Sequence, residues 1–249
     1  MNPVVWSCGL GVNSAAIAVG MVIHREAYDL AMFADTGGER PETYAYLRVL
    51  NEYVTAHGLP PIMTVWKKNP DETRAKTLEQ DCLDRKVLPS LAYGFKSCSD
   101  HYKIRPQRAV LKRWQPALDA WAAGRPVTML VGFDLDESHR QLKSFDTDKI
   151  VVRYPLVEWG WGRDECIAHI QAAGLPVPGK SSCFFCPSMR KKEIVALPPD
   201  LLSRAIALEQ NAELTDLAGL GRNFSWGALA QQQVLPMVET VEQSCACID

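Results

Sequence analysis

The chain has 249 residues, of which 47% are hydrophobic and 22% are charged, and its formal net charge at pH 7 is -2. These values are ordinary for a globular protein and exclude a disordered, collagen-like or coiled-coil chain. The near balance of charges also excludes a broadly basic surface that would coat nucleic acid or an anionic membrane. We therefore expect any anion-binding site to be local.

The sequence predicts a cytoplasmic protein that is not associated with membranes. The longest apolar run near the start, residues 15–23, is shorter than the roughly 18 residues that a membrane span needs. It is interrupted by Gly20 and no basic segment precedes it, so we expect no signal peptide. Eight cysteines are too few for a disulfide scaffold in a chain of this size. We expect reduced thiols that act as ligands, nucleophiles or core residues.

Short β-rich runs alternate with helical stretches along the first part of the chain. The β-rich runs are residues 4–6, 30–34, 62–66, 127–131 and 150–152. Helical patterns follow the first two runs, and helical material also covers residues 104–114. This order predicts an α/β fold with a doubly wound, mostly parallel sheet.

The composition changes after Pro155. We expect a short helix near residues 164–173, followed by a stretch rich in glycine and proline that is typical of an ordered functional loop. The chain from Pro198 onward is helical in composition. We predict one domain over residues 1–190, which carries a cysteine-containing loop, and a helical C-terminal extension over residues 191–249.

The first predicted strand runs into the loop Ser7-Cys8-Gly9-Leu10-Gly11-Val12-Asn13-Ser14 and then into a good helix start. Glycines let a backbone approach a phosphate, a serine offers a hydroxyl, and the N-terminus of a helix attracts anions. The loop is either an anion site of this kind or a turn that needs glycine. Its glycine spacing fits neither the P-loop pattern nor the Rossmann dinucleotide pattern, so both of those sites are disfavoured.

Four further stretches add to this loop. They are residues 33–37 with 41–44, residues 96–106, residues 132–140, and residues 155–159 leading to the segment Cys183-Phe184-Phe185-Cys186-Pro187. Together the five stretches resemble the phosphoadenosine phosphosulfate (PAPS) reductase family of the adenine-nucleotide α-hydrolase superfamily, in the family's order and over about three quarters of the chain. The resemblance implies that fold, and an enzyme that binds an adenine nucleotide and carries out sulfonucleotide reduction or related sulfur transfer.

The resemblance also implies that the phosphates of the nucleotide lie over the loop and against basic side chains. The residues expected to bind the nucleotide are Ser7, Gly9, Gly11, Asn13, Ser14, Asp35, Thr36, Gly37, Lys103, Arg105, Gly132 and Arg140. Asp35 and Thr36 follow the second strand, where ligands bind in open α/β sheets. Lys103 and Arg105, with Arg108 one turn later, are either a clamp for phosphate or sulfate or a solvated helix face.

Cys183 and Cys186 have the spacing of a ligand pair for a metal or a cluster. With Cys98 they are the three thiols whose counterparts in the reductase family hold a four-iron, four-sulfur cluster. One ligand is missing, because a serine precedes Cys98 where some reductases have a cysteine pair. The open alternatives are a three-thiolate cluster, an empty set of thiols, and a zinc site with a fourth ligand from His101, Cys166 or the tail.

Cys245 and Cys247 lie in the last stretch of the sequence. In sulfonucleotide reductases a cysteine on a C-terminal tail is the nucleophile that takes the sulfur, so the resemblance implies a catalytic role for this pair. A thioredoxin-like dithiol is then the expected reductant. Further metal ligands or incidental thiols are the alternatives.

Two other functions stay open. In one, ATP, with or without Mg²⁺, adenylates a nucleic acid base or a small molecule, and thiols or an iron-sulfur cluster deliver the sulfur. Asn13 disfavours it because ATP-hydrolysing relatives have an aspartate there, and the net charge of -2 disfavours a nucleic acid substrate. In the other, the chain is a non-catalytic nucleotide-binding module stabilised by zinc.

Overall fold

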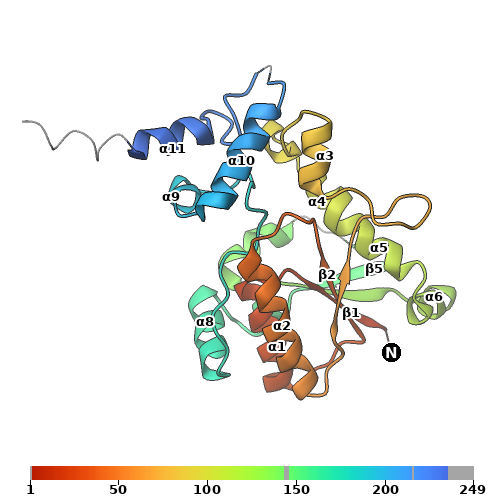
Figure 1. Ribbon diagram of the computed structural model, residues 1–249. Helices are drawn as coiled ribbons and strands as arrows, with labels where there is room; N and C mark the ends of the chain where they lie inside the picture. Colours follow the sequence, from red (N-terminus) through yellow and green to blue (C-terminus); the bar gives the residue numbers. More distant parts are fainter. Residues whose placement is uncertain (1, 143–145, 215, 235–249) are drawn as a thin grey trace, which may run out of the picture. The chain divides into compact units, whose positions relative to one another are not determined.

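The computed structural model describes residues 2–142, 146–214 and 216–234 (Figure 1). The chain forms two compact units: unit 1 consists of Met1–Ala75 and Ser99–Cys183, and unit 2 of Lys76–Cys98 and Phe184–Asp249. This division differs from the boundary expected at residue 190, because a segment from the middle of the chain also belongs to unit 2.

Unit 1 is built on a five-stranded sheet with the strand order β3-β2-β1-β4-β5. The strands are β1 (Val4–Cys8), β2 (Leu30–Ala34), β3 (Ile62–Val65), β4 (Val127–Val131) and β5 (Ile150–Arg153). All neighbouring strands are parallel, which confirms the predicted α/β class and the parallel sheet. The strand order reverses at β1, which lies between β2 and β4, and such switch points are where ligands bind in open parallel sheets.

Helices cover both faces of this sheet (Figure 1). On one face, Trp6 and Phe33 pack with α1 (Val12–His24), α2 (Pro41–Ala56) and α8 (Arg163–Ala172). On the other face, Val5 and Met32 pack with α5 (Arg105–Leu111) and α6 (Gln115–Ala122). Successive strand residues point to opposite faces, so a continuous apolar strand is stable only between two layers of helices. The fully buried β2 is such a strand.

Three short helical segments connect these elements in unit 1. The π-helix η2 (Asp100–Ile104) runs directly into α5, the 3-10 helix η3 (Leu135–Leu142) follows β4, and α7 (Pro155–Glu158) follows β5. A π-helix is rare and occurs frequently at functional sites, because its extra residue per turn changes the direction of the side chains around it.

Unit 2 is helical. It contains α3 (Leu78–Asp84), η1 (Ser90–Tyr93), α9 (Lys191–Val195), α10 (Pro199–Asn211) and α11 (Trp226–Val234), and α4 (Ser97–Ser99) lies where the chain passes back to unit 1. The buried carboxylate of Glu209 on α10 accepts hydrogen bonds from the backbone N–H groups of Leu220, Trp226 and Gly227, which fixes the start of α11. Within the described residues after Pro198, α10 and α11 agree with the predicted helical composition.

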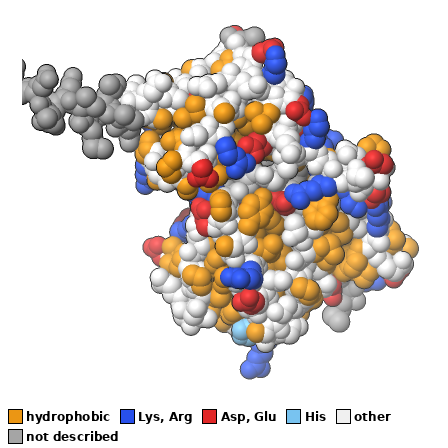
Figure 2. Space-filling model, viewed as in Figure 1, with side chains coloured by type: hydrophobic (Ala, Val, Ile, Leu, Met, Phe, Trp, Pro, Cys, Tyr) orange, Lys and Arg blue, Asp and Glu red, His pale blue; other side chains and the backbone are white. Residues whose placement is uncertain are grey.

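The surface agrees with the composition. On the face that Figure 2 shows, the Lys and Arg side chains drawn in colour lie in small separate groups, several of them beside Asp or Glu. Exposed ion pairs among the described residues include Lys68 with Glu72 and Lys86 with Glu213. Across the described ranges, no helix has the length and apolar character that crossing a membrane requires.

Candidate functional site

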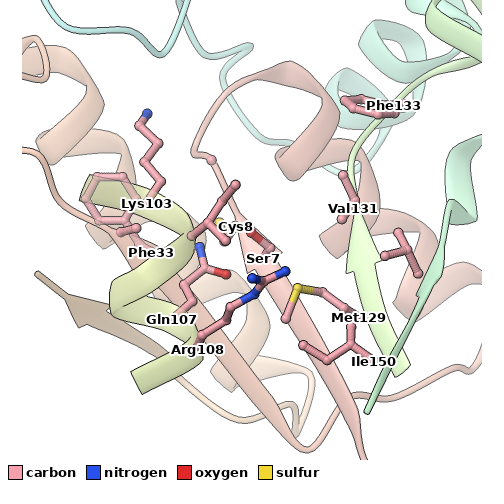
Figure 3. A pocket seen from close by; sticks show the side chains of 14 residues that line it. Ser7, Cys8, Phe33, Lys103, Gln107, Arg108, Met129, Val131, Phe133 and Ile150 are labelled. Atoms are coloured by element: carbon pink, nitrogen blue, oxygen red, sulfur yellow. The ribbon is translucent and has the colours of Figure 1, made fainter. Parts of the chain in front are cut away.

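A cavity of about 260 Å³ lies in unit 1 beside the carboxyl ends of β1, β2 and β4. Its floor is one face of the sheet: Ser7 pairs with Val131 and Met129 pairs with Val152, so these four side chains point the same way. The helical segment around α5 lies over this face and contributes Lys103, Ile104, Gln107 and Arg108 (Figure 3). The cavity therefore adjoins Gly9 and the loop that the sequence singles out.

The walls of the cavity are mostly apolar. Phe33, Met129, Val131 and Phe133 line it, and the Phe133 ring is held by stacking on Tyr154 at a centroid distance of 5.5 Å. No carboxylate occurs among the described residues that line it. An apolar slot with a few polar groups on one wall and an adjoining phosphate-type loop suits a flat heterocycle that carries an anionic group.

Arg108, and not Arg105, is the arginine that lines this cavity. The side chain of Arg105 is 64% exposed, and its Nε donates a hydrogen bond to Oδ2 of Asp100 at 2.7 Å. Figure 3 shows the guanidinium of Arg108 extending from α5 toward Ser7. The pair with Asp100 holds this exposed guanidinium, and Arg105 is not part of the cavity lining. Of the two arginines, the geometry favours Arg108 as the residue that faces a ligand in this cavity.

Lys103 lines the cavity and forms an ion pair with a buried carboxylate. Its Nζ lies 3.0 Å from Oε1 of Glu39, whose side chain is only 1% exposed. Oε2 of Glu39 has no hydrogen-bond partner in the described part of the chain. A buried carboxylate of this kind holds the ammonium group in one place.

The loop after β1 has the features of an anion site. Gly11 is the N-cap of α1, no side chain caps the helix, and its first turn carries no acidic residue. The Ser14 hydroxyl accepts a hydrogen bond from the Gly9 N–H at 2.7 Å and also interacts with the thiol of Cys8. Leu10 has a left-handed backbone with a φ of 59°, which is uncommon outside glycine and is found at functional turns.

Ser181 lies against this loop. A Cβ atom placed on Gly11 would stand 2.8 Å from Oγ of Ser181, which is closer than side chains tolerate. A side chain at position 11 would therefore have to displace the Ser181 hydroxyl, so the two segments approach closely. The hydroxyl of Ser181 adds a second serine donor beside the start of α1.

Asn13 is fully engaged by the protein. Its amide nitrogen donates to the Gly132 carbonyl and to Oε2 of Glu137, each at 3.1 Å, and its oxygen accepts from Arg163 at 3.1 Å. The backbone of Gly132 also lies close to Asn13, because a Cβ there would be 3.2 Å from Cβ of Asn13. Two residues expected to contact the nucleotide therefore contact each other.

Asp35 shapes the turn that follows β2. One carboxylate oxygen accepts from the Gly37 N–H at 2.7 Å and from the Tyr44 hydroxyl at 2.8 Å. The other accepts from Arg74 at 2.6 Å. Burial, together with the neighbouring Asp35 carboxylate, raises the pKa of Tyr44, so that phenol stays protonated. Asp35 thus fixes the backbone of Thr36 and Gly37 at the edge of the sheet.

The cysteine segment meets this same turn. Sγ of Cys183 lies 3.2 Å from Oγ1 of Thr36, and Glu39 forms an antiparallel bridge with Cys183. Ser181 and Cys183 therefore tie one short segment to the loop after β1 and to the turn after β2, all within unit 1.

The other two predicted ligands, Cys98 and Cys186, belong to unit 2. The Cys98 N–H donates to Oγ of Ser90, and Sγ of Cys186 lies 3.1 Å from Oγ of Ser188. Among the residues with described placement, no three His, Cys, Asp or Glu side chains form a group that could hold a metal ion. The cluster therefore stays a prediction from the sequence.

Three cysteines are core residues. Burial raises the pKa of Cys8, Cys82 and Cys166 to about 12 in each case, so these thiols are protonated at neutral pH. Cys245 and Cys247 lie outside the described residues. Arg140 is part of η3, and its side chain is also outside the described part of the structure.

Neither the known protein families nor the curated proteins gave a match to this sequence. The roles of the site residues therefore rest on their geometry and on the motifs of the chain itself.

Sequence reasoning missed two residues of the site. Gln107 is buried on the wall of the cavity, and Ser181 touches the phosphate-type loop. A signal for Gln107 is present in the sequence, because it precedes Leu111 by one helical turn and so shares its core face. No sequence signal places Ser181 against Gly11, since that contact depends on the tertiary structure.

Proposed function

We propose that the chain binds an adenine nucleotide in the cavity of unit 1 and acts on it as a sulfonucleotide reductase, or a related sulfur-transfer enzyme, of the PAPS reductase type. The observation that carries this proposal is the position of the segment with Ser181 and Cys183. It contacts the loop after β1 through Ser181 and the turn after β2 through Cys183. A thiol-bearing segment is thereby attached to the candidate nucleotide site.

Each part of a nucleotide has a counterpart in the site. The apolar lining with Met129 and Val131 receives the base, and the N–H groups at the start of α1 with the hydroxyl of Ser14 donate hydrogen bonds to phosphate oxygens. Lys103 and Arg108 supply positive charge at the same cavity. The phosphates and the base then lie along the carboxyl ends of the strands, as they do in open parallel sheets with bound nucleotides.

The proposed reaction is a thiol-dependent reduction. A cysteine thiolate attacks the sulfonate sulfur of PAPS, an S–S bond forms, and the S–O bond to the nucleotide breaks, so that adenosine 3′,5′-bisphosphate leaves. A thiolate of a thioredoxin-like dithiol then attacks the cysteine sulfur and releases sulfite, and its second thiol resolves the mixed disulfide. The dithiol supplies both electrons. Cys245 and Cys247 are the proposed nucleophiles.

Cys98, Cys183 and Cys186 are the proposed ligands of an iron-sulfur cluster, with zinc as the alternative. Thiolates are the ligands that both prefer, and Cys183 is already held beside Thr36. When bound, a cluster would supply positive charge or redox chemistry near the nucleotide. None of the steps above uses it.

The arrangement around Asn13 favours this reaction over ATP cleavage. Its amide is held by bonds with Gly132, Glu137 and Arg163, and it offers one neutral oxygen where ATP-hydrolysing relatives offer a carboxylate to a metal-bound pyrophosphate. An adenylating sulfurtransferase needs a ligand for that metal at the loop. Sulfonucleotide reduction needs only the hydrogen-bond donors for phosphate oxygens that the loop and the start of α1 present.

The test is a turnover assay under anaerobic conditions. The protein is incubated with reduced thioredoxin and with PAPS, adenosine phosphosulfate or ATP in separate reactions, and sulfite and nucleotide products are measured. We expect equal amounts of sulfite and nucleoside phosphate from a sulfonucleotide, and no sulfite from a variant with both Cys245→Ser and Cys247→Ser. Cleavage of ATP to AMP without sulfite, or nucleotide binding without any turnover, would overturn the proposal.

A further inference from the structure

Gln107 is a polar residue on the buried face of α5, which otherwise packs on the sheet with apolar side chains. It lies one turn before Leu111, which is fully buried in the core between α5 and the sheet. Gln107 is itself only 7% exposed and lines the cavity. Residues at this spacing share one helix face. The face of α5 that packs on the sheet therefore carries the carboxamide of Gln107 at the point where the cavity begins.

The carboxamide of Gln107 has no hydrogen-bond partner within the described part of the chain. Figure 3 shows it extending from α5 toward Ser7 and Cys8 on the cavity wall. The nitrogen and oxygen of this carboxamide are not fully buried, so they keep access to the cavity although the residue as a whole is buried. Ser7, Lys103 and Arg108 are the other polar residues of the lining. A carboxamide that makes no bond within the described residues and faces a cavity is free to bond with a ligand there.

We infer that Gln107 determines the base specificity of this site by hydrogen bonding with the polar edge of adenine. The inference rests on the proposed binding of an adenine nucleotide. A carboxamide presents a donor and an acceptor side by side, and adenine presents its 6-amino group beside a ring nitrogen with the complementary order. The apolar side chains of the sheet face, such as Met129 and Ile150, then contact the ring, and Gln107 bonds with its edge.

The test combines a change in the protein with a change in the ligand. Affinities for adenosine 5′-monophosphate and for purine riboside 5′-monophosphate, which lacks the 6-amino group, are measured by calorimetry in wild type and in Gln107→Leu. We expect wild type to prefer the adenosine nucleotide by about tenfold, and Gln107→Leu to lose that preference. The same variant without nucleotide should unfold cooperatively at a temperature close to that of wild type, because no hydrogen bond of the described residues depends on the carboxamide.

Two further variants complete the experiment. Gln107→Met keeps the length of the side chain but removes both its donor and its acceptor, so it should also lose the preference even if Gln107→Leu folds poorly. Gln171→Leu, on the exposed face of α8, should change neither affinity. An unchanged preference in Gln107→Leu and Gln107→Met, or an equal loss of both ligands with a lower unfolding temperature, would overturn the role of Gln107. If wild type binds neither nucleotide nor any other adenine nucleotide, the proposed function fails instead.

Discussion

Sγ of Cys183 lies 3.2 Å from Oγ1 of Thr36, although 147 positions separate the two residues in the chain. Thr36 follows β2 in the turn that Asp35 fixes, and Cys183 comes two residues after Ser181, which meets the loop at Gly11. The contact therefore sets the position of a thiol relative to both turns of the candidate nucleotide site. This relationship links the cysteine motif to the phosphate-type loop within one unit.

Two arginines on α5 provide a matched pair for nucleotide binding. Arg108→Ala removes a cation that lines the cavity and should weaken the binding of an adenine nucleotide by about tenfold, the effect of losing one charged hydrogen bond. Arg105→Ala removes a largely exposed side chain paired with Asp100 and should leave affinity nearly unchanged. Calorimetry measures both. The reverse order of effects would place the phosphates on the other side of α5.

The contact of Gly11 with Ser181 predicts the result of a double-mutant cycle. Gly11→Ala should lower the free energy of unfolding by about 1–3 kcal/mol, because its new Cβ would stand 2.8 Å from Oγ of Ser181. Adding Ser181→Ala removes that oxygen and should restore most of the loss. Denaturant titrations give both values.

Gly9→Ala is the matched control in the same loop, since its Cβ would meet no atom closer than 3.5 Å. It should be tolerated in the stability measurement. Equal destabilisation by the two alanines, with no rescue by Ser181→Ala, would show that Ser181 does not lie on the loop.

The fold was largely predictable from the sequence, for a physical reason. All five strands are short β-rich runs that the sheet buries, and their alternation with helices specifies parallel pairing. The strand order is harder to predict from the sequence, because the β-rich runs that pair with β1 on its two sides have similar composition. The sequence also does not show that Lys76–Cys98 belongs to unit 2, because its contacts with α10, such as Glu79 with Arg204, join residues that are far apart in the chain.

The candidate site was predictable only in part. The glycines, Asp35 and Thr36 follow strands, and their position at the edge of the sheet follows from the topology. The choice between Arg105 and Arg108 depends on which face of α5 packs on the sheet and on the π-helix η2 before it. A spacing pattern that assumes a regular α-helix cannot contain that information.

A partly exposed ion pair, Glu26 with Arg153, gives a prediction for pH. Hydrogen bonds from Arg153, and to a smaller extent from Trp159, lower the pKa of Glu26 from its ordinary value of 4.5. A carboxylate with a lowered pKa stabilises the fold above its unfolded pKa, and this stabilisation is lost as the pH falls through the folded pKa. Glu26→Gln should therefore cost about 1 kcal/mol at pH 7 and progressively less below about pH 4.5.

Thermal or denaturant unfolding over this pH range measures the difference between wild type and Glu26→Gln. The exposed Glu52 on α2 offers a control in Glu52→Gln, which should follow the wild type at every pH. A cost for Glu26→Gln that does not change with pH would argue that packing, and not the charge, makes the contribution.

The proposed metal site predicts a colour and a metal content. Protein purified without oxygen should be brown and contain about four iron and four sulfide per chain, and Cys186→Ala should abolish the visible absorbance. Cys166→Ala, in the core of unit 1, should keep the colour and lower only the stability. A colourless protein with one zinc ion would move these thiols to a structural role. Full colour in Cys186→Ala would show that the ligands lie elsewhere.

The most direct test of the account is a calorimetric titration of the full chain with adenosine 3′,5′-bisphosphate, the nucleotide product of the proposed reaction. We predict saturable binding at one site per chain, weakened in Arg108→Ala and retained in Arg105→Ala. Absence of binding for this nucleotide, and for adenosine 5′-monophosphate and ATP under the same conditions, by a protein that unfolds cooperatively would contradict the assignment of the cavity in unit 1 as an adenine nucleotide site.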